Sequence, residues 1–235
     1  MPRADAVLFD YGRTLVTFTY PTARLLDVIE RFRPAIAEAT GRPAPEARRI
    51  MDDVLLPLEA VIENPGEVEV RYLDVYAEAW SRAGIQLPGS LLLEILDAEQ
   101  QVWDDVAEVD ADAPGVLLWL REHGIKSGVC SNAPFPPEMM VRQVEKNGIA
   151  ARVDAAVFSS GLGRRKPAPE LYRAALDAVG VGAERALFVG DRVREDYEGP
   201  LAVGMQAVIC TAHAAEMPPD GIPTIPSLKH LPGIL

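Results

Sequence analysis

A single aspartate stands at the end of the first apolar run of the chain. Residues 6–9 (Ala-Val-Leu-Phe) precede Asp10, and the turn Tyr-Gly-Arg-Thr follows it at 11–14. The run is too short for a helix and is typical of a buried strand, which would place Asp10 at the carboxyl end of that strand. Ligands bind at this end of the strands in open α/β sheets, so Asp10 is a candidate for catalysis or metal binding. The structural alternative is an aspartate that caps a turn or a helix.

Further polar residues stand after later apolar runs. Ser131 and Asn132 follow one run, Asp191 and then Asp196 follow another, and a loop between these runs carries Lys166. Because the carboxyl ends of parallel strands meet at one edge of a sheet, we expect all of these side chains to lie near the first aspartate. The three carboxylates would repel one another unless a cation neutralises them, and an all-oxygen site of this kind suits Mg²⁺.

The elements that must position these residues fall into two regions. From about residue 112 onward, short apolar runs alternate with amphipathic segments, which predicts an α/β fold with a parallel sheet covered by helices on both faces. The expected strands are 126–130, 154–158, 186–189 and 206–210. Residues 17–111 instead show about four helical patterns without strands between them. We therefore predict a core domain of residues 1–16 and 112–235, with an inserted helical domain at 17–111 that covers the edge where Asp10 points.

The composition limits the class of partner. The chain has 235 residues with 35 acidic and 23 basic side chains, a net charge of −12, which argues against binding to nucleic acid or an anionic membrane surface. No apolar run approaches the roughly 20 residues that span a bilayer, and the N-terminus does not resemble a signal peptide. A cytoplasmic protein that acts on a small molecule, as a monomer or a homodimer, is expected. Cys130 and Cys210 stand in apolar runs without a ligand pattern and are expected to be buried thiols.

In these motifs the chain resembles the haloacid dehalogenase (HAD) superfamily of hydrolases. Residues 9–15 (Phe-Asp-Tyr-Gly-Arg-Thr-Leu) are similar to its first motif and Ser131-Asn132 to its second. Lys166-Pro167 is similar to the third motif, and residues 190–196 to the fourth. The resemblance extends over residues 4–235 and implies a three-layer, Rossmann-like α/β core with a helical cap domain of the C1 type.

The resemblance also assigns roles. Asp10 is the expected nucleophile, which would form an aspartyl phosphate, and Lys166 is expected to neutralise charge between it and the phosphate. The expected phosphate-binding residues are Thr14, Ser131 and Asn132. The expected ligands of Mg²⁺ are Asp10, Asp191, Asp196 and the main-chain carbonyl of Gly12. These roles imply a Mg²⁺-dependent phosphatase acting on a small phosphorylated metabolite.

The chain departs from the family pattern at Gly12. Phosphatases of the family usually carry a second aspartate at this place, where it protonates the leaving group and then activates water. Glycine has no side chain for this proton transfer, which is typically worth ~10²–10⁴-fold in rate. The next residue, Arg13, can bind phosphate, but a guanidinium stays protonated and is a poor general acid.

Three explanations are consistent with this departure. The first, which we predict, is a phosphatase whose leaving group needs little protonation or whose proton donor lies elsewhere in the cap. The second is another reaction of the superfamily. A dehalogenase needs no metal, whereas Asp191 here offers a metal carboxylate, and phosphonate cleavage uses a cap lysine, which residues 17–111 lack. The third is a catalytically weak phosphate-binding or interaction protein.

Overall fold

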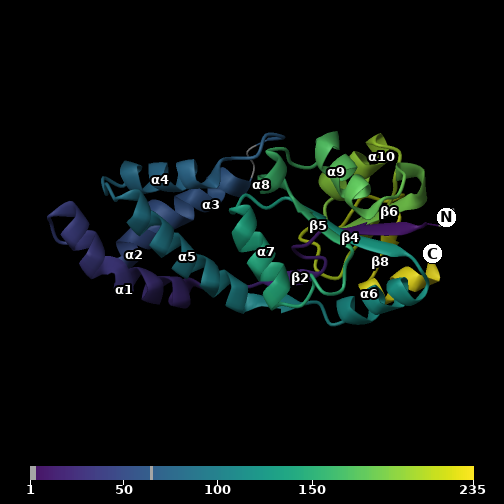
Figure 1. Ribbon diagram of the computed structural model, residues 1–235, viewed down its shortest axis with the longest axis horizontal. Helices are drawn as coiled ribbons and strands as arrows, with labels where there is room; N and C mark the ends of the chain where they lie inside the picture. Colours follow the sequence, from purple (N-terminus) through teal and green to yellow (C-terminus); the bar gives the residue numbers. More distant parts are fainter. Residues whose placement is uncertain (1–3, 64–65) are drawn as a thin grey trace.

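The computed structural model describes residues 4–63 and 66–235. The first three residues of the predicted core domain lie outside these ranges. The molecule is elongated, with a strand-containing core region at one end and a helical region at the other (Figure 1). Both described chain ends lie at the end of the core region that is remote from the helical region (Figure 1).

A parallel sheet forms the centre of the core region. Its six described strands have the order β5-β4-β1-β6-β7-β8. They are β1 (Ala6–Phe9), β4 (Lys126–Ser131), β5 (Ala155–Phe158), β6 (Ala186–Gly190), β7 (Gln206–Cys210) and β8 (Thr224–Ile225). The predicted α/β fold with a parallel sheet is confirmed, and the four strands expected after residue 112 are present with small shifts at their ends.

The strand order reverses around β1. The chain runs from β1 outward through β4 to β5 on one side and through β6 and β7 on the other. The register pairs Phe9, the last residue of β1, with Val129 of β4 and Val189 of β6. Asp10 and the polar residues that follow β4 and β6 therefore emerge together at the topological switch point, where ligands bind in open α/β sheets.

Helices cover both faces of the sheet. The described helical segments here are α6 (Ala113–Glu122), α7 (Pro137–Lys146), α8 (Ser159–Leu162), α9 (Pro169–Val179), η2 (Ala183–Arg185), η3 (Val193–Glu198), α10 (Gly199–Ala202) and η4 (Leu228–Gly233). Val7 and Phe9 pack in the cluster with α6 and α7, whereas Ala6 and Leu8 pack in the cluster with α9. Burial on both faces explains why β1 is an unbroken apolar run rather than an alternating one.

The helical region has a core of its own. Its helices are α1 (Thr22–Thr40), α2 (Ala47–Ile50), η1 (Met51–Leu55), α3 (Leu56–Glu63), α4 (Tyr72–Arg82) and α5 (Gly89–Val106). Since α2, η1 and α3 follow one another without a break, they form a single helical body, and the region has about the four bodies that the sequence patterns predict. Tyr76, Trp80 and Ile95 are among the side chains buried between them.

Two short strands join the regions, and here the expectation of no strand within residues 17–111 is wrong. β2 (Val16–Phe18) pairs antiparallel with β3 (Ala107–Val109). Three residues are too few for an alternating pattern to be recognised in a sequence. The pairing holds the entry to the helical region beside its exit. The positions of the two predicted domain boundaries remain a proposal.

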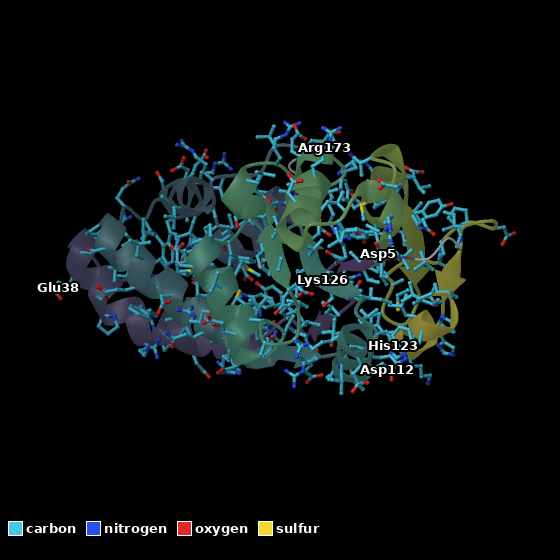
Figure 2. The ribbon with its side chains drawn as sticks, turned by 45° about the vertical axis from the view of Figure 1, so that its right-hand side comes forward. Asp5, Glu38, Asp112, His123, Lys126 and Arg173 are labelled. Atoms are coloured by element: carbon cyan, nitrogen blue, oxygen red, sulfur yellow. The ribbon has the colours of Figure 1, made fainter. Side chains whose placement is uncertain are left out.

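Charged side chains project from the outside of both regions (Figure 2). Glu38 lies at the end of the helical region, far from the sheet, and Arg173 projects from the core region (Figure 2). Within the described ranges, no helix combines the length and the apolar character needed to cross a membrane.

Candidate active site

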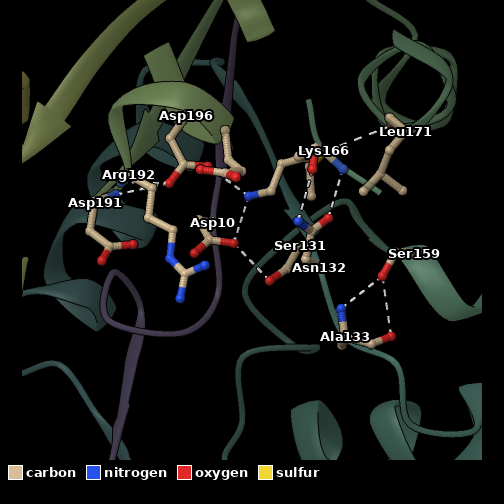
Figure 3. A network of polar contacts seen from close by, with 12 residues as sticks. Asp10, Ser131, Asn132, Ala133, Ser159, Lys166, Leu171, Asp191, Arg192 and Asp196 are labelled. Carbon is tan, nitrogen blue, oxygen red and sulfur yellow. Dashed lines mark hydrogen bonds and ion pairs between the residues drawn. The ribbon is translucent and has the colours of Figure 1, made fainter. Parts of the chain in front are cut away.

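Asp10 is the centre of a polar network at the carboxyl edge of the sheet (Figure 3). Its backbone N–H donates to the carbonyl of Val189 at 2.9 Å, which fixes it to β6. Its side chain is largely buried, and Oδ1 accepts hydrogen bonds from Ser131 Oγ and Lys166 Nζ, both at 2.7 Å. The predicted strand-end residues from β1, β4 and the Lys166 loop therefore meet at one carboxylate.

Lys166 links two carboxylates. The residue is 3% exposed, and its ammonium donates to Asp10 Oδ1 and to Asp196 Oδ1, each at 2.7 Å. Burial by itself would lower the pKa of this lysine, but the charges of Asp10 and Asp196 outweigh that effect and hold its pKa above the ordinary value. The ammonium therefore stays charged, and Phe188 packs beneath it with its ring centroid 5.0 Å from Nζ.

Asn132 positions the lysine loop. Its side-chain Oδ1 accepts from the backbone N–H of Lys166 at 2.7 Å, and its Nδ2 donates to the Lys166 carbonyl at 3.1 Å. The side-chain amide is thus engaged with the backbone of the loop. Asn132 also lines the cavity described below.

Asp196 is completely buried and is held by the turn after β6. Its Oδ2 accepts from the backbone N–H groups of Asp191 at 3.1 Å and Arg192 at 2.9 Å. A Cβ at position 190 would lie 2.3 Å from Asp196 Cγ, so only Gly190 permits this approach. Burial raises the pKa of Asp196 to about 6, although the nearby Lys166 acts in the opposite direction.

The three acidic residues form a cluster. Asp10, Asp191 and Asp196 each offer a carboxylate oxygen, and these oxygens all lie within 4.8 Å of one another. Burial, followed by the charges of Asp10 and Asp196, raises the pKa of Asp191 to about 7. Its Oδ2 is buried and has no hydrogen-bond partner among the described residues. An all-oxygen set with surplus negative charge and one unsatisfied buried oxygen fits a hard divalent cation.

A cavity of about 630 Å³ separates the network from the helical region. The core side of its wall includes Asp10, Gly12, Arg13, Ser131, Asn132, Lys166, Asp191 and Asp196. The helical side and its approach include Phe18, Tyr20, Leu56, Glu59, Ile62 and Glu63. A neighbouring pocket of about 410 Å³ shares part of this wall and reaches Trp103 of α5. The space is large enough for a small organic ligand.

Two predicted residues of the turn after Asp10 have different positions. Arg13 is exposed, lines the cavity, and has a left-handed backbone with φ of 60°. A non-glycine residue in this conformation costs roughly 1–2 kcal/mol. Thr14 is 1% exposed, its hydroxyl has no hydrogen-bond partner among the described residues, and it is not part of the cavity wall. The predicted contact of Thr14 with phosphate therefore stays a prediction.

The sequence motifs do not point to the helical side of the cavity. Tyr20 and Trp103 look like packing residues in the sequence, and their rings do pack edge to face at 5.3 Å between centroids. Tyr20 lines the cavity that contains Asp10, and both residues line the neighbouring pocket. Glu59 had one recognisable signal, since it is a lone charge within the apolar stretch 54–62.

A family model of haloacid dehalogenase-like hydrolases matches residues 4–204. The chain belongs to this family and is a hydrolase. Two solved structures illustrate the shared fold. A 2-haloacid dehalogenase from Pseudomonas syringae superimposes with a TM-score of 0.71 at 21% identity over 98% of this chain and 97% of the other. A HAD phosphatase from Thermococcus onnurineus gives 0.62 at 22% identity over the same shares.

Two relatives of the chain are named as phosphatases. The glyceraldehyde 3-phosphate phosphatase of Methanopyrus kandleri is 29% identical over 206 residues, which cover 86% of this chain and 82% of that protein. The phosphoserine phosphatase of Thermus thermophilus is 28% identical over 218 residues, which cover 88% and 82%.

Proposed function

We propose that this protein is a Mg²⁺-dependent phosphatase that hydrolyses a small phosphorylated metabolite through an aspartyl phosphate on Asp10. The observation that carries the proposal is the position of the Asp10 carboxylate, which lies at the cavity wall with Lys166 and Ser131 bound to one of its oxygens. The relatives named as phosphatases support the same reaction class.

The hydrogen bonds of Asp10 favour attack by one oxygen. Both fall on Oδ1, and among the described residues Oδ2 has no hydrogen-bond partner. In the proposed reaction Oδ2 bonds to phosphorus as the bond from phosphorus to the leaving-group oxygen breaks. Water then attacks the phosphorus of the aspartyl phosphate, which releases inorganic phosphate and restores the carboxylate.

Several groups are suited to bind the phosphoryl oxygens. Ser131 and the backbone around Asn132 supply hydrogen-bond donors at the cavity wall, and the exposed guanidinium of Arg13 lies on the same wall. Lys166 keeps its charge between two carboxylates and offsets the negative charge of the phosphate. The energetic cost of the left-handed backbone at Arg13 is consistent with a role for its side chain in binding.

Mg²⁺ fits the acidic cluster. Asp10, Asp191, Asp196 and the main-chain carbonyl of Gly12 would hold it, and the surplus charge and the unsatisfied Asp191 oxygen support this choice. The bound ion would shield the phosphate from the carboxylates and polarise it. The net charge of −12 also favours a small substrate over a nucleic acid, and we place the enzyme in the cytoplasm.

Hydrolysis of p-nitrophenyl phosphate tests the proposal. We expect turnover with Mg²⁺ and its loss with excess chelator. Asp10→Asn is expected to lower kcat by about 10⁴-fold or more, because it removes the nucleophile. Asp177→Asn, a change at an exposed position of α9, is the matched control and should behave as the unmodified protein.

Two other outcomes would contradict the proposal. Release of halide from 2-haloacids without added metal would indicate a dehalogenase. Failure to hydrolyse any member of a panel of aryl, acyl and alkyl phosphates would favour a phosphate-binding protein without catalytic activity.

A further inference from the structure

The proposed reaction needs a proton for the leaving group, and Gly12 cannot supply it. An alkoxide is a poor leaving group unless an acid protonates its oxygen as the bond to phosphorus breaks. The donor must come from another group on the cavity wall. The titratable residues of that wall can be taken in turn.

On the core side of the wall, each titratable side chain either has another role or cannot release a proton. Asp10 is the proposed nucleophile, and Asp191 and Asp196 belong with it to the acidic cluster. The Lys166 ammonium already donates to two carboxylates. Arg13 and Arg192 are guanidinium groups, which do not release a proton in the working range of an enzyme.

Other groups near the entrance are also poor donors. Glu195 is already paired with a cation, the guanidinium of Arg194, at 3.6 Å. Glu63 is exposed to solvent. The hydroxyl of Tyr20 is directed to the sulfur of Met51 at 3.8 Å, and burial raises the pKa of this tyrosine to about 12.

Glu59 differs from all of these. It lies on α3 and lines both pockets, whose walls also include Gly12, Phe18 and Ile62. It is only partly exposed, and among the described residues it forms no hydrogen bond and no ion pair. A carboxyl group without a partner in an apolar wall is free to bind the leaving-group oxygen of a substrate.

The surroundings of Glu59 favour its protonated form. Burial, and next the charge of Glu63 on the same helix, raise its pKa to about 7. The other titratable groups that interact with it are Glu99 of α5, Tyr20 before α1 and Tyr72 of α4, and none of them is a cation. Arg13 and Arg165 line the same cavity, but neither forms an ion pair with it in the described structure. A donor is most effective when its pKa is close to the working pH.

We propose that the Glu59 carboxyl replaces the side chain that Gly12 lacks and donates its proton to the leaving-group oxygen as the phosphorus–oxygen bond breaks. The resulting carboxylate then accepts a proton from the water that attacks the aspartyl phosphate, which restores the acid. The inference rests on the proposed phosphatase function. It makes Glu59 a catalytic residue supplied by the helical region.

The dependence of the rate on the leaving group tests this role. p-Nitrophenolate departs without protonation, whereas the alkoxide of propyl phosphate needs a proton. In Glu59→Gln we expect kcat/KM for propyl phosphate, which reports the steps through departure of the leaving group, to fall by ~10²–10⁴-fold, and kcat/KM for p-nitrophenyl phosphate to fall far less. Glu94→Gln, at an exposed position of α5, is the matched control and should show no such difference between the two esters.

A pH profile gives a second measurement. In the unmodified enzyme kcat/KM for propyl phosphate should fall as the pH rises through about 7, because Glu59 then loses its proton. Glu59→Gln should not show this fall with rising pH, whereas Glu59→Asp should show it at a reduced overall rate.

The outcomes separate the two proposals. Equal losses on both esters in Glu59→Gln, with hydrolysis of both by the unmodified protein, would overturn the role of Glu59 and leave the phosphatase intact. If the unmodified protein hydrolysed neither of the two esters, the proposed phosphatase function itself would be overturned. Hydrolysis of the aryl ester by Glu59→Gln also reports that the variant is folded.

Discussion

The two sides of the cavity differ in whether their charged side chains are paired. On the core side, Asp10, Lys166 and Asp196 form a chain of ion pairs with nitrogen–oxygen distances of 2.7 Å. On the helical side, Glu59 lies among aromatic and aliphatic side chains without a charged partner. A paired network keeps fixed charges for the phosphoryl group, whereas an isolated carboxyl can exchange a proton. This contrast fits the two proposals, which place phosphoryl transfer on the core side and departure of the leaving group on the helical side.

The two sides are also physically fastened to each other. Residues 67–69, between α3 and α4, bind the loop that leads to Lys166. The backbone N–H of Glu69 donates to the Gly163 carbonyl at 3.1 Å, and that of Arg165 donates to the Glu67 carbonyl at 2.9 Å. The Arg165 guanidinium also forms a buried ion pair with Glu69 at 3.0 Å. The loop at residues 163–166 therefore carries the lysine of the core side and also binds one end of the helical region.

The largest effect is expected from breaking the paired network of the core side. Lys166→Met removes the cation between two carboxylates and should lower kcat for p-nitrophenyl phosphate by about 10³-fold or more. Steady-state kinetics measures the loss. Lys229→Met, at an exposed position near the C-terminus, is the control. A rate within tenfold of the unmodified enzyme would show that the network is not needed for phosphoryl transfer.

The contact between the two sides is tested by its buried ion pair. Arg165→Met leaves the carboxylate of Glu69 buried without its cation and should lower the free energy of unfolding by about 3–5 kcal/mol. The neighbouring Arg164 has its side chain 35% exposed, and Arg164→Met should cost about 0–1 kcal/mol. Urea denaturation of both variants makes the comparison. Equal losses in the free energy of unfolding would mean that the buried Arg165–Glu69 pair stabilises the protein no more than the partly exposed Arg164 does.

A smaller effect, on the pH dependence of stability, is expected at Glu99 in the helical region. This carboxyl is buried on α5, accepts a hydrogen bond from the Tyr76 hydroxyl at 3.1 Å, and has a pKa that burial raises from 4.5 to about 8. The folded protein holds a proton that the unfolded chain releases between these values, so stability should fall as the pH rises from 4.5 to 8.

Glu99→Gln removes this dependence. Between pH 5 and pH 8.5 the unmodified protein should lose about 2–4 kcal/mol of stability relative to the variant. Urea denaturation at the two pH values measures the difference, with Glu94→Gln on the exposed side of the same helix as the control. Parallel pH dependence in Glu99→Gln and the unmodified protein would show that Glu99 is charged when folded.

Much of the core side could be predicted from the sequence because strand ends have a simple rule. Short apolar runs form parallel strands, and the residue after each run emerges at one edge. Asp10, Ser131 and Asp191 follow that rule, and the gap at Gly12 is visible in the same motif. The short strands β2 and β3 were missed, because three residues carry no periodicity.

The sequence by itself determined the class of fold, the residues that converge on Asp10, and the absence of a proton donor at position 12. Only the tertiary structure decided what faces that gap. Glu59 is 49 residues from Asp10 along the chain, and no local pattern relates a residue on an amphipathic helix to a strand end. The packing of the helical region brings the two to one cavity, and removal from water then sets the proton affinity of the carboxyl.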